Sequence, residues 1–443
     1  MRRLVFYVLG LAILIAIAVW LADRPGNVEI QWGDYLITTS VAVLVLIIAI
    51  LAVVVAILYR GWIWLKKGPG RWRKSLHQNR RERGYESLTR GLVALAAGDS
   101  SEARRYARRA DDMLDRPPLT LLLSAQAAQL DGDDKAATET FEAMLERPET
   151  EFLGLRGLMV EALRRGDYEA AREYARRAHQ LRPDAAWAAE ALFELETRDG
   201  DWQAAQRTLE SAVDRRAVGK PVSKRRRAVV LVERARAALK DLKRSEAIKF
   251  AREAHAEAPE LVPAAILLAD LLVDEQKFRP AAKTLEQTWA VDPHPDLAKA
   301  YRRAARDEDA IATYRRMEKL VKAAPNSVES HVASARAALD AGLTGEARRH
   351  LDDAAKIEMS HRIAQLYVAL EEKEGNDDAA QEWLRKAADA DVDKGWQCER
   401  CGHVADTWAP VCPHCGTFDS LAWTKPHAVA PAVTGRALTP LAS

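Results

Sequence analysis

The chain has few cysteines, few aromatic residues and almost no net charge. Its 443 residues contain four cysteines, all between positions 398 and 415, which excludes a disulfide framework elsewhere and suits a reducing compartment. Lys and Arg (66) nearly balance Asp and Glu (64), so no global positive field indicates nucleic-acid binding. Aromatic residues make up 7% of the chain while Ala, Leu, Arg and Glu are abundant, which favours helix over sheet.

Two long apolar runs lie near the N-terminus. Leu4–Ala22 and Leu36–Tyr59 are uncharged stretches of 19 and 24 residues, each long enough to cross a hydrocarbon core of about 30 Å. A cleaved signal peptide is the alternative for the first run, but the second run follows only 13 residues later, which favours a membrane hairpin. The loop Asn27–Tyr35 alternates polar and apolar residues and is expected to be short and extended.

The distribution of Lys and Arg around these runs predicts their orientation. Residues 23–35 carry one Arg and three carboxylates, whereas residues 60–83 carry nine Lys or Arg and one Glu. Cytoplasmic loops are enriched in Lys and Arg, so both termini are expected on the cytoplasmic side of a bacterial inner membrane. Two interpretations of the basic stretch stay open: it determines the membrane topology only, or it also binds anionic lipid. It contains three tryptophans, Trp62, Trp64 and Trp72.

A 34-residue repeat begins near residue 84. Four Gly-Asp pairs recur at that spacing, and an Ala follows five positions after each Gly. The pattern continues less regularly to residue 393, which gives about nine units. The interval grows to 42 residues between Ala205 and Ala247 and shrinks to 29 between Ala281 and Ala310, so one unit is expected to have a lengthened helix and another a shortened one. The regular pairs start at Gly98, Gly132, Gly166 and Gly200.

One unit shows why this pattern predicts a helical hairpin. In residues 153–181 apolar side chains recur at helical spacing, and Gly166 can end the first helix with a positive φ. Asp167 can cap the second helix, and the small Ala171 lets the two helices approach closely. A single hairpin cannot bury its apolar face, so the units are expected to stack into a solenoid.

These residues resemble the tetratricopeptide repeat family over residues 84–393. Gly166-Asp167-Tyr168, Ala171 and Pro183 match that family's turn, its small position and its helix-ending proline. The resemblance implies an all-α solenoid whose concave face holds segments of partner proteins.

The lengthened unit contains a cationic cluster between residues 215 and 227. Two interpretations stay open, namely a docking site for an acidic partner or lipid headgroup, and a solvated loop. The cluster consists of Arg215, Arg216, Lys220 and Lys224–Arg227.

The four cysteines form two Cys-x2-Cys pairs separated by ten residues, a strong signal for tetrahedral metal binding. Four thiolates leave no open position, so a structural Zn²⁺ is expected, with iron as an alternative. Gly402 and Gly416 are expected to let the backbone turn and to donate amide hydrogens to the sulfurs. Cys412-Pro413 also resembles a heme-responsive motif, but nothing else in the sequence supports heme binding. The expected ligands are Cys398, Cys401, Cys412 and Cys415.

The N-terminal loop carries a second family resemblance. Asp23–Gly33 contains Pro-Gly-x-Val-x-Ile-x-Trp-Gly and is similar to the HemY family of proteobacterial inner-membrane proteins, as are Ala258–Ala265 and Pro293–Leu297. The resemblance implies two spans ahead of helical repeats. It also implies a link to tetrapyrrole (heme) synthesis, in which the family is associated with organising late-pathway enzymes or handling heme, without an established catalytic activity.

The cysteine tail resembles a different membrane-tethered repeat protein. Its Cys-x2-Cys-Gly and Cys-Pro-x-Cys pairs are similar to the rubredoxin-like end of lipopolysaccharide assembly protein B, which adapts a membrane protease to its substrate. That protein has one span, so the two-span N-terminus favours the HemY-like interpretation and leaves the protease adaptor as the alternative.

No catalytic constellation is evident in the sequence, and we expect no enzyme. The helix histidines share no motif and are expected to be structural or solvated, and the chain has no Gly-x-Gly-x-x-Gly loop between a strand and a helix. The histidines in question are His179, His255, His331, His350 and His361.

These patterns together predict an all-α protein in four parts. They are a two-span anchor with a basic segment (1–83), a tetratricopeptide-like solenoid (84–393), a four-Cys zinc-ribbon or rubredoxin-like knuckle (394–423) and a disordered tail (424–443). We expect an inner-membrane scaffold that binds tetrapyrrole-pathway enzymes or other membrane proteins. Membrane lipid and a second copy of the chain are further expected partners.

Overall fold

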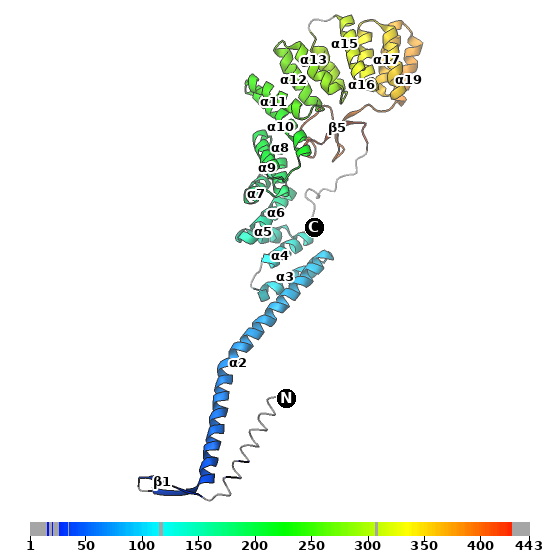
Figure 1. Cartoon of the computed structure of the whole chain (residues 1–443). Coiled ribbons are helices and arrows are strands. Elements are labelled where there is room, and N and C mark those ends of the chain that lie inside the picture. The colour runs from blue at the N-terminus through cyan, green and yellow to red at the C-terminus, as the bar shows by residue number, and fades with distance from the viewer. Residues whose placement is uncertain are drawn as a thin grey trace. The chain divides into compact units, whose positions relative to one another are not determined.

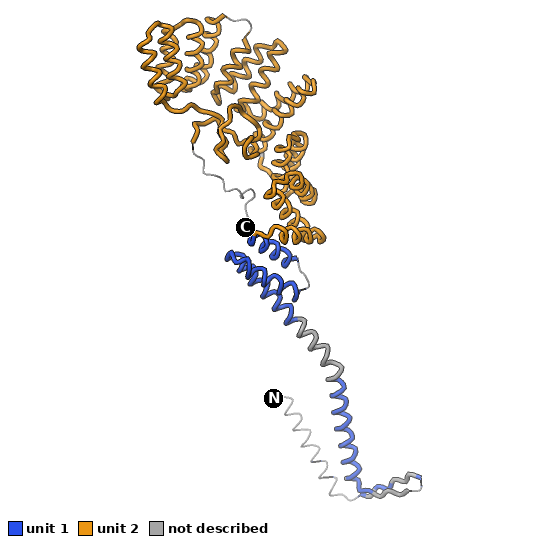
Figure 2. The backbone as a smooth tube through the Cα atoms, turned by 180° about the vertical axis from the view of Figure 1, so that it is seen from behind, with its two compact units in different colours: residues 1–131 blue, residues 132–443 orange. Residues whose placement is uncertain are grey.

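The computed structural model describes residues 16, 20, 26–33, 35–114, 118–305 and 309–427. The chain divides into two compact units, residues 1–131 and 132–443 (Figure 2). The predicted all-α solenoid is confirmed in outline, because helices make up most of the described residues and strands form only two small sheets among them.

From residue 26 the first unit contains a β-hairpin and a long helix. Strands β1 (Asn27–Trp32) and β2 (Tyr35–Ser40) pair antiparallel, so the loop expected to be extended is a hairpin. Helix α2 (Val41–Ala96) follows directly, and the Ser40 hydroxyl caps it by accepting a hydrogen bond from the Val43 amide at 3.4 Å. The unit therefore changes from strand to helix at a single capping residue.

One of the two predicted membrane spans lies within the described residues, and the other lies mostly outside them. Residues 36–40 of the run Leu36–Tyr59 lie in strand β2, because β-branched threonines favour a strand and Ser40 begins the helix. The helical segment Val43–Ile63 is long and apolar enough to span a membrane, and none of it is buried. The other run, Leu4–Ala22, lies outside the described residues except for positions 16 and 20. Of the three tryptophans, Trp62 is exposed and the other two side chains are not described.

Helix α2 continues through position 83, where the membrane anchor was expected to end. Its last turns pack on α3 (Ser100–Leu114) and α4 (Pro118–Asp131). Residue 98 has a φ of 81°, and the Asp99 carboxylate accepts a hydrogen bond from the amide of residue 102 at 2.8 Å, so the turn has the predicted Gly-Asp chemistry. The first repeat therefore begins within the helix that includes the candidate span. Its core contains Leu88, Ala107, Ala110 and Leu123.

The described part of the second unit contains the helices α5 to α19 (Figure 1). Neighbours along the chain pack in pairs, α6 on α7, α8 on α9, α10 on α11, α12 on α13, α16 on α17 and α18 on α19. The bounds are α5 (Asp134–Leu145), α6 (Pro148–Arg165), α7 (Tyr168–Leu181), α8 (Ala186–Asp199), α9 (Trp202–Asp214), α10 (Lys220–Lys240), α11 (Arg244–Glu257), α12 (Val262–Asp274), α13 (Phe278–Trp289), α14 (Pro295–Arg303), α15 (Ala310–Ala323), α16 (Val328–Asp340), α17 (Thr344–Ile357), α18 (His361–Glu374) and α19 (Asp377–Asp389).

The turns between paired helices have the predicted chemistry. Gly166 ends α6 with a φ of 75°, and the Asp167 carboxylate accepts a hydrogen bond from the amide of residue 170 at 3.0 Å. Ala171 is fully buried against the neighbouring helix, as its small size predicts. Where Gly is missing, Leu242 and Gln276 adopt the same left-handed backbone, with φ of 60° and 61°. The hairpins therefore continue past the point at which the Gly-Asp signal ends.

Two helices account for the irregular repeat intervals. Helix α10 has 21 residues and lies in the 42-residue interval, whereas α14 has only 9 residues and lies in the 29-residue interval. Both match the expected lengthened and shortened helices.

A small sheet follows the last helix. Strands β3 (Gly395–Cys398), β4 (Val404–Ala405) and β5 (Leu421–Thr424) form an antiparallel sheet in the order β4-β3-β5. We call residues 395–427 the four-Cys module. The tail expected to be disordered from residue 424 is ordered through residue 427, because Thr424 pairs with residue 395 and Lys425 forms ion pairs. Residues 428–443 lie outside the described part.

Candidate metal centre and its docking surface

The four cysteine sulfurs come together at one point of the four-Cys module. They all lie within 4.8 Å of one another, with Cys398 3.7 Å from Cys415 and Cys401 3.8 Å from Cys412. Sulfurs around a tetrahedral metal with bonds of about 2.3 Å would lie about 3.8 Å apart, whereas a disulfide needs about 2.05 Å. The arrangement therefore fits a four-coordinate metal ion and not a pair of disulfides.

The two glycines shape the knuckles in a way that was only half anticipated. Gly402 and Gly416 have φ of 74° and 72°, which confirms the expected turns. Their amides donate to the carbonyl oxygens of Cys398 and Cys412, both at 2.9 Å, and not to the sulfurs. The Cys398 sulfur instead accepts from backbone amides within its own knuckle, including that of Cys401. A tight turn aims the intermediate amides at the sulfur and leaves the glycine amide to close the turn.

Hydrogen bonding divides the cysteines into more and less acidic thiols. Although burial alone raises its pKa, interactions with the Ser420 hydroxyl and the backbone lower the pKa of Cys398 to about 6. Burial raises the pKa of Cys401 to about 12 and also raises that of Cys412. Because a metal ion binds thiolates, the lowered pKa favours the form of Cys398 that a metal ion would bind.

The loop after the second cysteine pair joins the module to the solenoid. The Asp419 carboxylate accepts two hydrogen bonds from the Arg225 guanidinium of α10, at 2.6 and 3.1 Å, across 194 positions of sequence. The Phe418 ring meets the Phe193 ring of α8 edge-on, with centroids 5.0 Å apart. Burial raises the pKa of Asp419 despite the Arg225 charge. This contact therefore combines a bidentate pair of charged side chains with a pair of aromatic rings.

A second contact is built around His294, the residue before α14. Its ring lies 5.1 Å from that of Trp396 on β3 and 4.4 Å from that of Trp423 on β5, measured between centroids. Its Nδ1 accepts a hydrogen bond from the Asp296 amide at 3.1 Å and so caps α14. The side chain is fully buried, and burial lowers the pKa of His294 to about 4, so the ring is neutral at pH 7.

A third contact lies at the other end of the module. The Lys425 ammonium is 3.1 Å from the Glu358 carboxylate at the end of α17 and 2.8 Å from that of Asp391 beyond α19. Solenoid side chains that meet the module thus come from well-separated helices. We call four of them, Phe193, Arg225, His294 and Glu358, the docking surface.

Three arginines of the cationic cluster of residues 215–227 pair with acidic side chains of the same chain, whereas Arg215 and Arg216 are exposed in the turn before α10. Arg225 binds the four-Cys module, Arg226 makes two hydrogen bonds of 2.5 and 2.7 Å to Glu190, and Arg227 lies 3.5 Å from Glu257. These three arginines therefore form neither a solvated loop nor a site for an external acidic partner. Their acidic partners lie in the same chain, at positions too distant in sequence for a local pattern to reveal.

The helix histidines are not all separate. His331 of α16 and His350 of α17 lie with their Nδ1 atoms 3.3 Å apart, and His350 Nε2 is 2.8 Å from the Glu318 carboxylate. Burial lowers the pKa of His350. His255 and His361 form hydrogen bonds within the fold, as expected of structural residues. Among the residues that the structure describes, the cysteines form the one group of three or more His, Cys, Asp or Glu placed to hold a metal.

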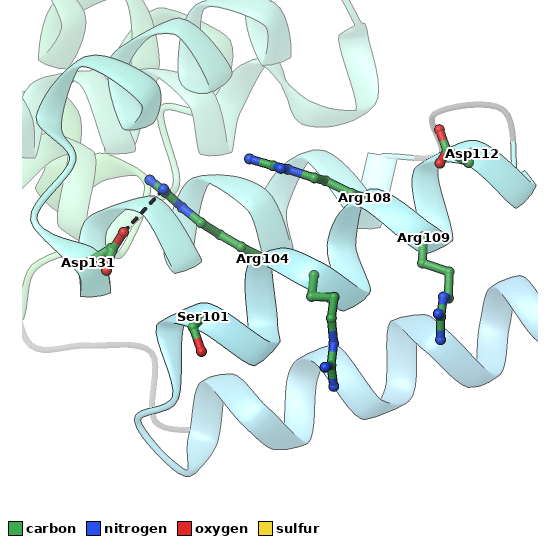
Figure 3. A pocket seen from close by; sticks show the side chains of 7 residues that line it. Ser101, Arg104, Arg108, Arg109, Asp112 and Asp131 are labelled. Atoms are coloured by element: carbon green, nitrogen blue, oxygen red, sulfur yellow. Dashed lines mark ion pairs between the residues drawn. The ribbon is translucent and has the colours of Figure 1, made fainter.

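A cationic surface on the first unit was not anticipated. Four arginines of α3, at positions 104, 105, 108 and 109, line a shallow pocket together with Asp112 and Asp131 (Figure 3). Arg104 forms an ion pair with Asp131 at 3.1 Å. The signal was present in the sequence, because the spacing i, i+1, i+4, i+5 puts four arginines on one helical face. Two of the four already pair with carboxylates of the same chain, Arg104 with Asp131 and Arg105 with Glu102 at 2.5 Å.

Sequence reasoning also missed the residues that dock the module. His294 was noted only within the Pro293–Leu297 resemblance, and Phe418 and Asp419 carried no motif. The available signal was the two tryptophans, Trp396 and Trp423, flanking the cysteine pairs, which is more aromatic surface than a small knuckle can bury alone.

Comparison with known proteins gives a partial match to a family and a long match to one relative. Residues 26–132 match the family model described as the HemY protein N-terminus. The chain is 27% identical over 436 residues to the probable magnetosome protein Mms48 of Magnetospirillum gryphiswaldense, covering 96% of this chain and 93% of that protein.

Solved structures of repeat proteins show limited similarity. A tetratricopeptide repeat protein from Parabacteroides merdae has 15% identity and a TM-score of 0.27, with 56% of this chain and 93% of that chain covered. Naa15/Naa10 bound to HypK-THB has 14% identity and a TM-score of 0.41, with 71% and 51% covered. The MamA protein has 13% identity and a TM-score of 0.25, with 37% and 90% covered. These similarities do not identify a function.

The family match falls on the part of the chain that contains the β-hairpin, helix α2 and the first repeat helices. It includes most of the loop residues, from Gly26 to Gly33, on which the resemblance was based. The resemblance to the HemY family is therefore confirmed over residues 26–132.

Proposed function

We propose that this protein is a non-catalytic scaffold, anchored in a bacterial inner membrane, that binds partner proteins through its helical repeats. One observation carries the proposal: the candidate span Val43–Ile63 and the first repeat are parts of a single helix, α2. A helix rises about 1.5 Å per residue, so the first repeat lies within about 50 Å of the end of the span along this helix. The helix would therefore hold the first repeat close to the membrane.

The topology is part of the same proposal. We infer a second span at Leu4–Ala22 and a cytoplasmic location for both termini, supported by the nine Lys or Arg of residues 60–83. The β1–β2 hairpin would then face the opposite side. An alkaline phosphatase fused into this hairpin should be active, and one fused after residue 427 should be inactive. The reverse pattern would overturn the topology.

The case against catalysis comes from how the polar side chains are used. Among the described residues, arginines and carboxylates pair along and between helices, as Arg164 does with Asp134 at 2.9 Å and Arg348 with Glu371 at 2.8 Å. Such pairs hold hairpins in register and leave their charges neutralised. A repeat surface of this kind recognises protein segments through extended contacts.

The biological setting is proposed from similarity. The HemY N-terminal match supports a link to tetrapyrrole synthesis, with late-pathway enzymes or other membrane proteins as partners. The name of the relative Mms48 refers to the magnetosome and to no reaction. A scaffold role for this chain is compatible with such a setting. Lipid contact by the basic segment and self-association remain further proposals.

The alternative function is an adaptor of a membrane protease in lipopolysaccharide or envelope regulation. It rests on the four-Cys module, whose paired knuckles resemble the tail of lipopolysaccharide assembly protein B. Porphyrin pools and lipopolysaccharide levels of a deletion strain separate the two settings. Accumulated porphyrin supports the first, and altered lipopolysaccharide with normal porphyrin supports the second.

We propose Zn²⁺ as the metal of the four-Cys module, with Cys398, Cys401, Cys412 and Cys415 as its ligands. The support is the sulfur spacing described above and the lack of an open coordination position in an all-thiolate shell. Such an ion is structural. Its chemistry is to hold the two knuckles together, and iron is the alternative ion that metal analysis would distinguish.

The scaffold proposal is tested with the full-length protein purified from its native membrane. Chemical crosslinking followed by mass spectrometry should place partner proteins on helices of the repeat region, while the preparation turns over no porphyrin intermediate. Turnover that a single His substitution abolishes would replace the scaffold with an enzyme.

A further inference from the structure

The four-Cys module touches helices on both sides of α14, the shortest of the described solenoid helices. Its Asp419 and Phe418 meet α10 and α8, its tryptophans enclose His294 at the start of α14, and Lys425 reaches the end of α17. Helix α14 has 9 residues, whereas α12 and α16 have 13 each. Because α14 is short, it offers its neighbours less helix–helix contact than the longer helices do. The module contacts helices on both sides of α14.

We propose that the four-Cys module is a metal-dependent clamp, which holds the helices before and after α14 together by binding the docking surface. With the metal bound, the clamp is closed and the docking surface is covered. Without it, the knuckles lose their shape and the docking surface is released. This inference rests on the structural metal proposed above, but not on the identity of any partner protein.

The coupling between metal and clamp follows from the short path between ligands and docking residues. Phe418 lies three positions after Cys415 and pairs with residue 411 in an isolated bridge, and the Asp419 amide donates to the carbonyl of residue 410 at 2.7 Å. The Cys412 amide donates to the Thr417 carbonyl at 2.9 Å. The second knuckle and the docking loop are therefore one hydrogen-bonded unit, and the loop keeps its shape only while the knuckle does.

The other knuckle is coupled to the second contact in the same manner. Strand β3 contains both the ligand Cys398 and the docking residue Trp396, and it pairs with β5, in which Trp423 lies opposite Trp396. These side chains share one core, which includes Cys398, Cys412 and Leu421. A metal that fixes Cys398 therefore also fixes the aromatic pair that encloses His294.

The released surface has a definite chemistry. Phe193 and Arg225 receive an aromatic residue followed directly by a carboxylate, which is the pair Phe418-Asp419. The module thus acts as a ligand built into the same chain. A partner segment that competes for the open surface would carry an aromatic residue next to an acidic one.

Hydrogen exchange of the full chain in lipid nanodiscs tests the clamp, with zinc content measured on each sample. In Arg225→Ala one side of the ion pair is lost while all four cysteines remain. Zinc should stay at about one per chain, and exchange should rise by about tenfold in residues 395–427 and at the start of α14. The matched control is Arg164→Ala, which removes the ion pairs of α6 with Asp134 and Glu161 and should leave these segments unchanged.

The metal arm uses Cys412→Ser with Cys415→Ser. This variant should lose zinc and show faster exchange in α8 and α10 near Phe193 and Arg225, as well as in the module. A synthetic peptide containing Phe-Asp should bind this variant and not the wild-type protein. Unchanged exchange in the solenoid helices of both variants would overturn the clamp. If the purified wild-type protein contains no metal, the proposal of a structural metal is wrong. The Arg225→Ala variant would still show whether the module binds the docking surface.

Discussion

The solenoid and the four-Cys module reach order by different routes. In the solenoid, buried residues are mostly small or aliphatic and recur in every hairpin, so each helix depends on its neighbours and no single contact is decisive. The module has three short strands and a core of a few aromatic and cysteine side chains, too little for stability by itself. We therefore expect its order to depend on the cysteine cluster and on its contacts with distant helices. Repetition spreads stability over the chain, whereas the metal that we propose for the module would concentrate it at one point.

The largest expected effect comes from replacing two of the four cysteines. Replacing Cys401 and Cys415 by Ser should remove about one zinc per chain and unfold the module, because a structural zinc contributes on the order of 10 kcal/mol to the folding of a small domain. The helical circular dichroism of the repeats should persist. Metal analysis and dichroism of the same sample give the answer, and unchanged zinc content would refute the ligand assignment.

The next largest effect concerns pH and the contact at His294. The folded pKa of about 4 lies below the ordinary value of 6.5, so the unfolded chain binds a proton more readily. The stabilisation is complete above pH 6.5 and is lost as pH falls through 4, a change of roughly 3 kcal/mol at most.

Urea unfolding at several pH values measures this effect. In His294→Asn the cap of α14 can persist, but the titrating ring is gone, so the midpoint should change less between pH 6.5 and 4 than in the wild type. Both proteins keep the cysteines, so their difference isolates the histidine. Identical pH profiles would show that His294 is not held neutral.

A third prediction concerns the close packing of the solenoid. A Cβ at Gly157 of α6 would overlap the Phe141 ring of α5, so Gly157→Ala should destabilise the fold by about 1–3 kcal/mol. The matched control is Gly345→Ala in α17, where a Cβ meets nothing within 4 Å and helix propensity predicts a gain of roughly 0.5–1 kcal/mol. Thermal unfolding distinguishes the two, and equal melting temperatures would contradict the packing described for α5 and α6.

The smallest effect tests the turn chemistry of one repeat. Asp167→Ala removes the N-cap of α7 and should cost about 1 kcal/mol. Glu169→Ala removes a carboxylate from the same first turn without removing the cap, and it should cost less. Urea midpoints of the two variants measure the difference. A larger loss for Glu169→Ala would mean that charge near the helix end, and not the cap, holds the turn.

The comparison also shows which features could be predicted from sequence. Gly166, Asp167 and Ala171 act through contacts within one hairpin, so a 34-residue pattern was sufficient to predict their roles. Each cysteine pair could be predicted because its two members lie within one tight turn, and the spacing of the two pairs is typical of one metal site. The contact between Arg225 and Asp419 spans 194 positions, and no local pattern encodes it. The β2 strand was assigned to the membrane helix because hydropathy does not separate an apolar strand from the helix that follows it.

Binding of partner proteins by the helical repeats is the central function that we propose for this chain. The most direct measurement is crosslinking mass spectrometry of the full-length chain in its native membrane, quantified against the protein itself. We predict that one or a few membrane-associated proteins crosslink to the repeat helices in near-equal amounts. A chain that crosslinks to no protein above background, yet converts a porphyrin substrate when purified, would contradict the account.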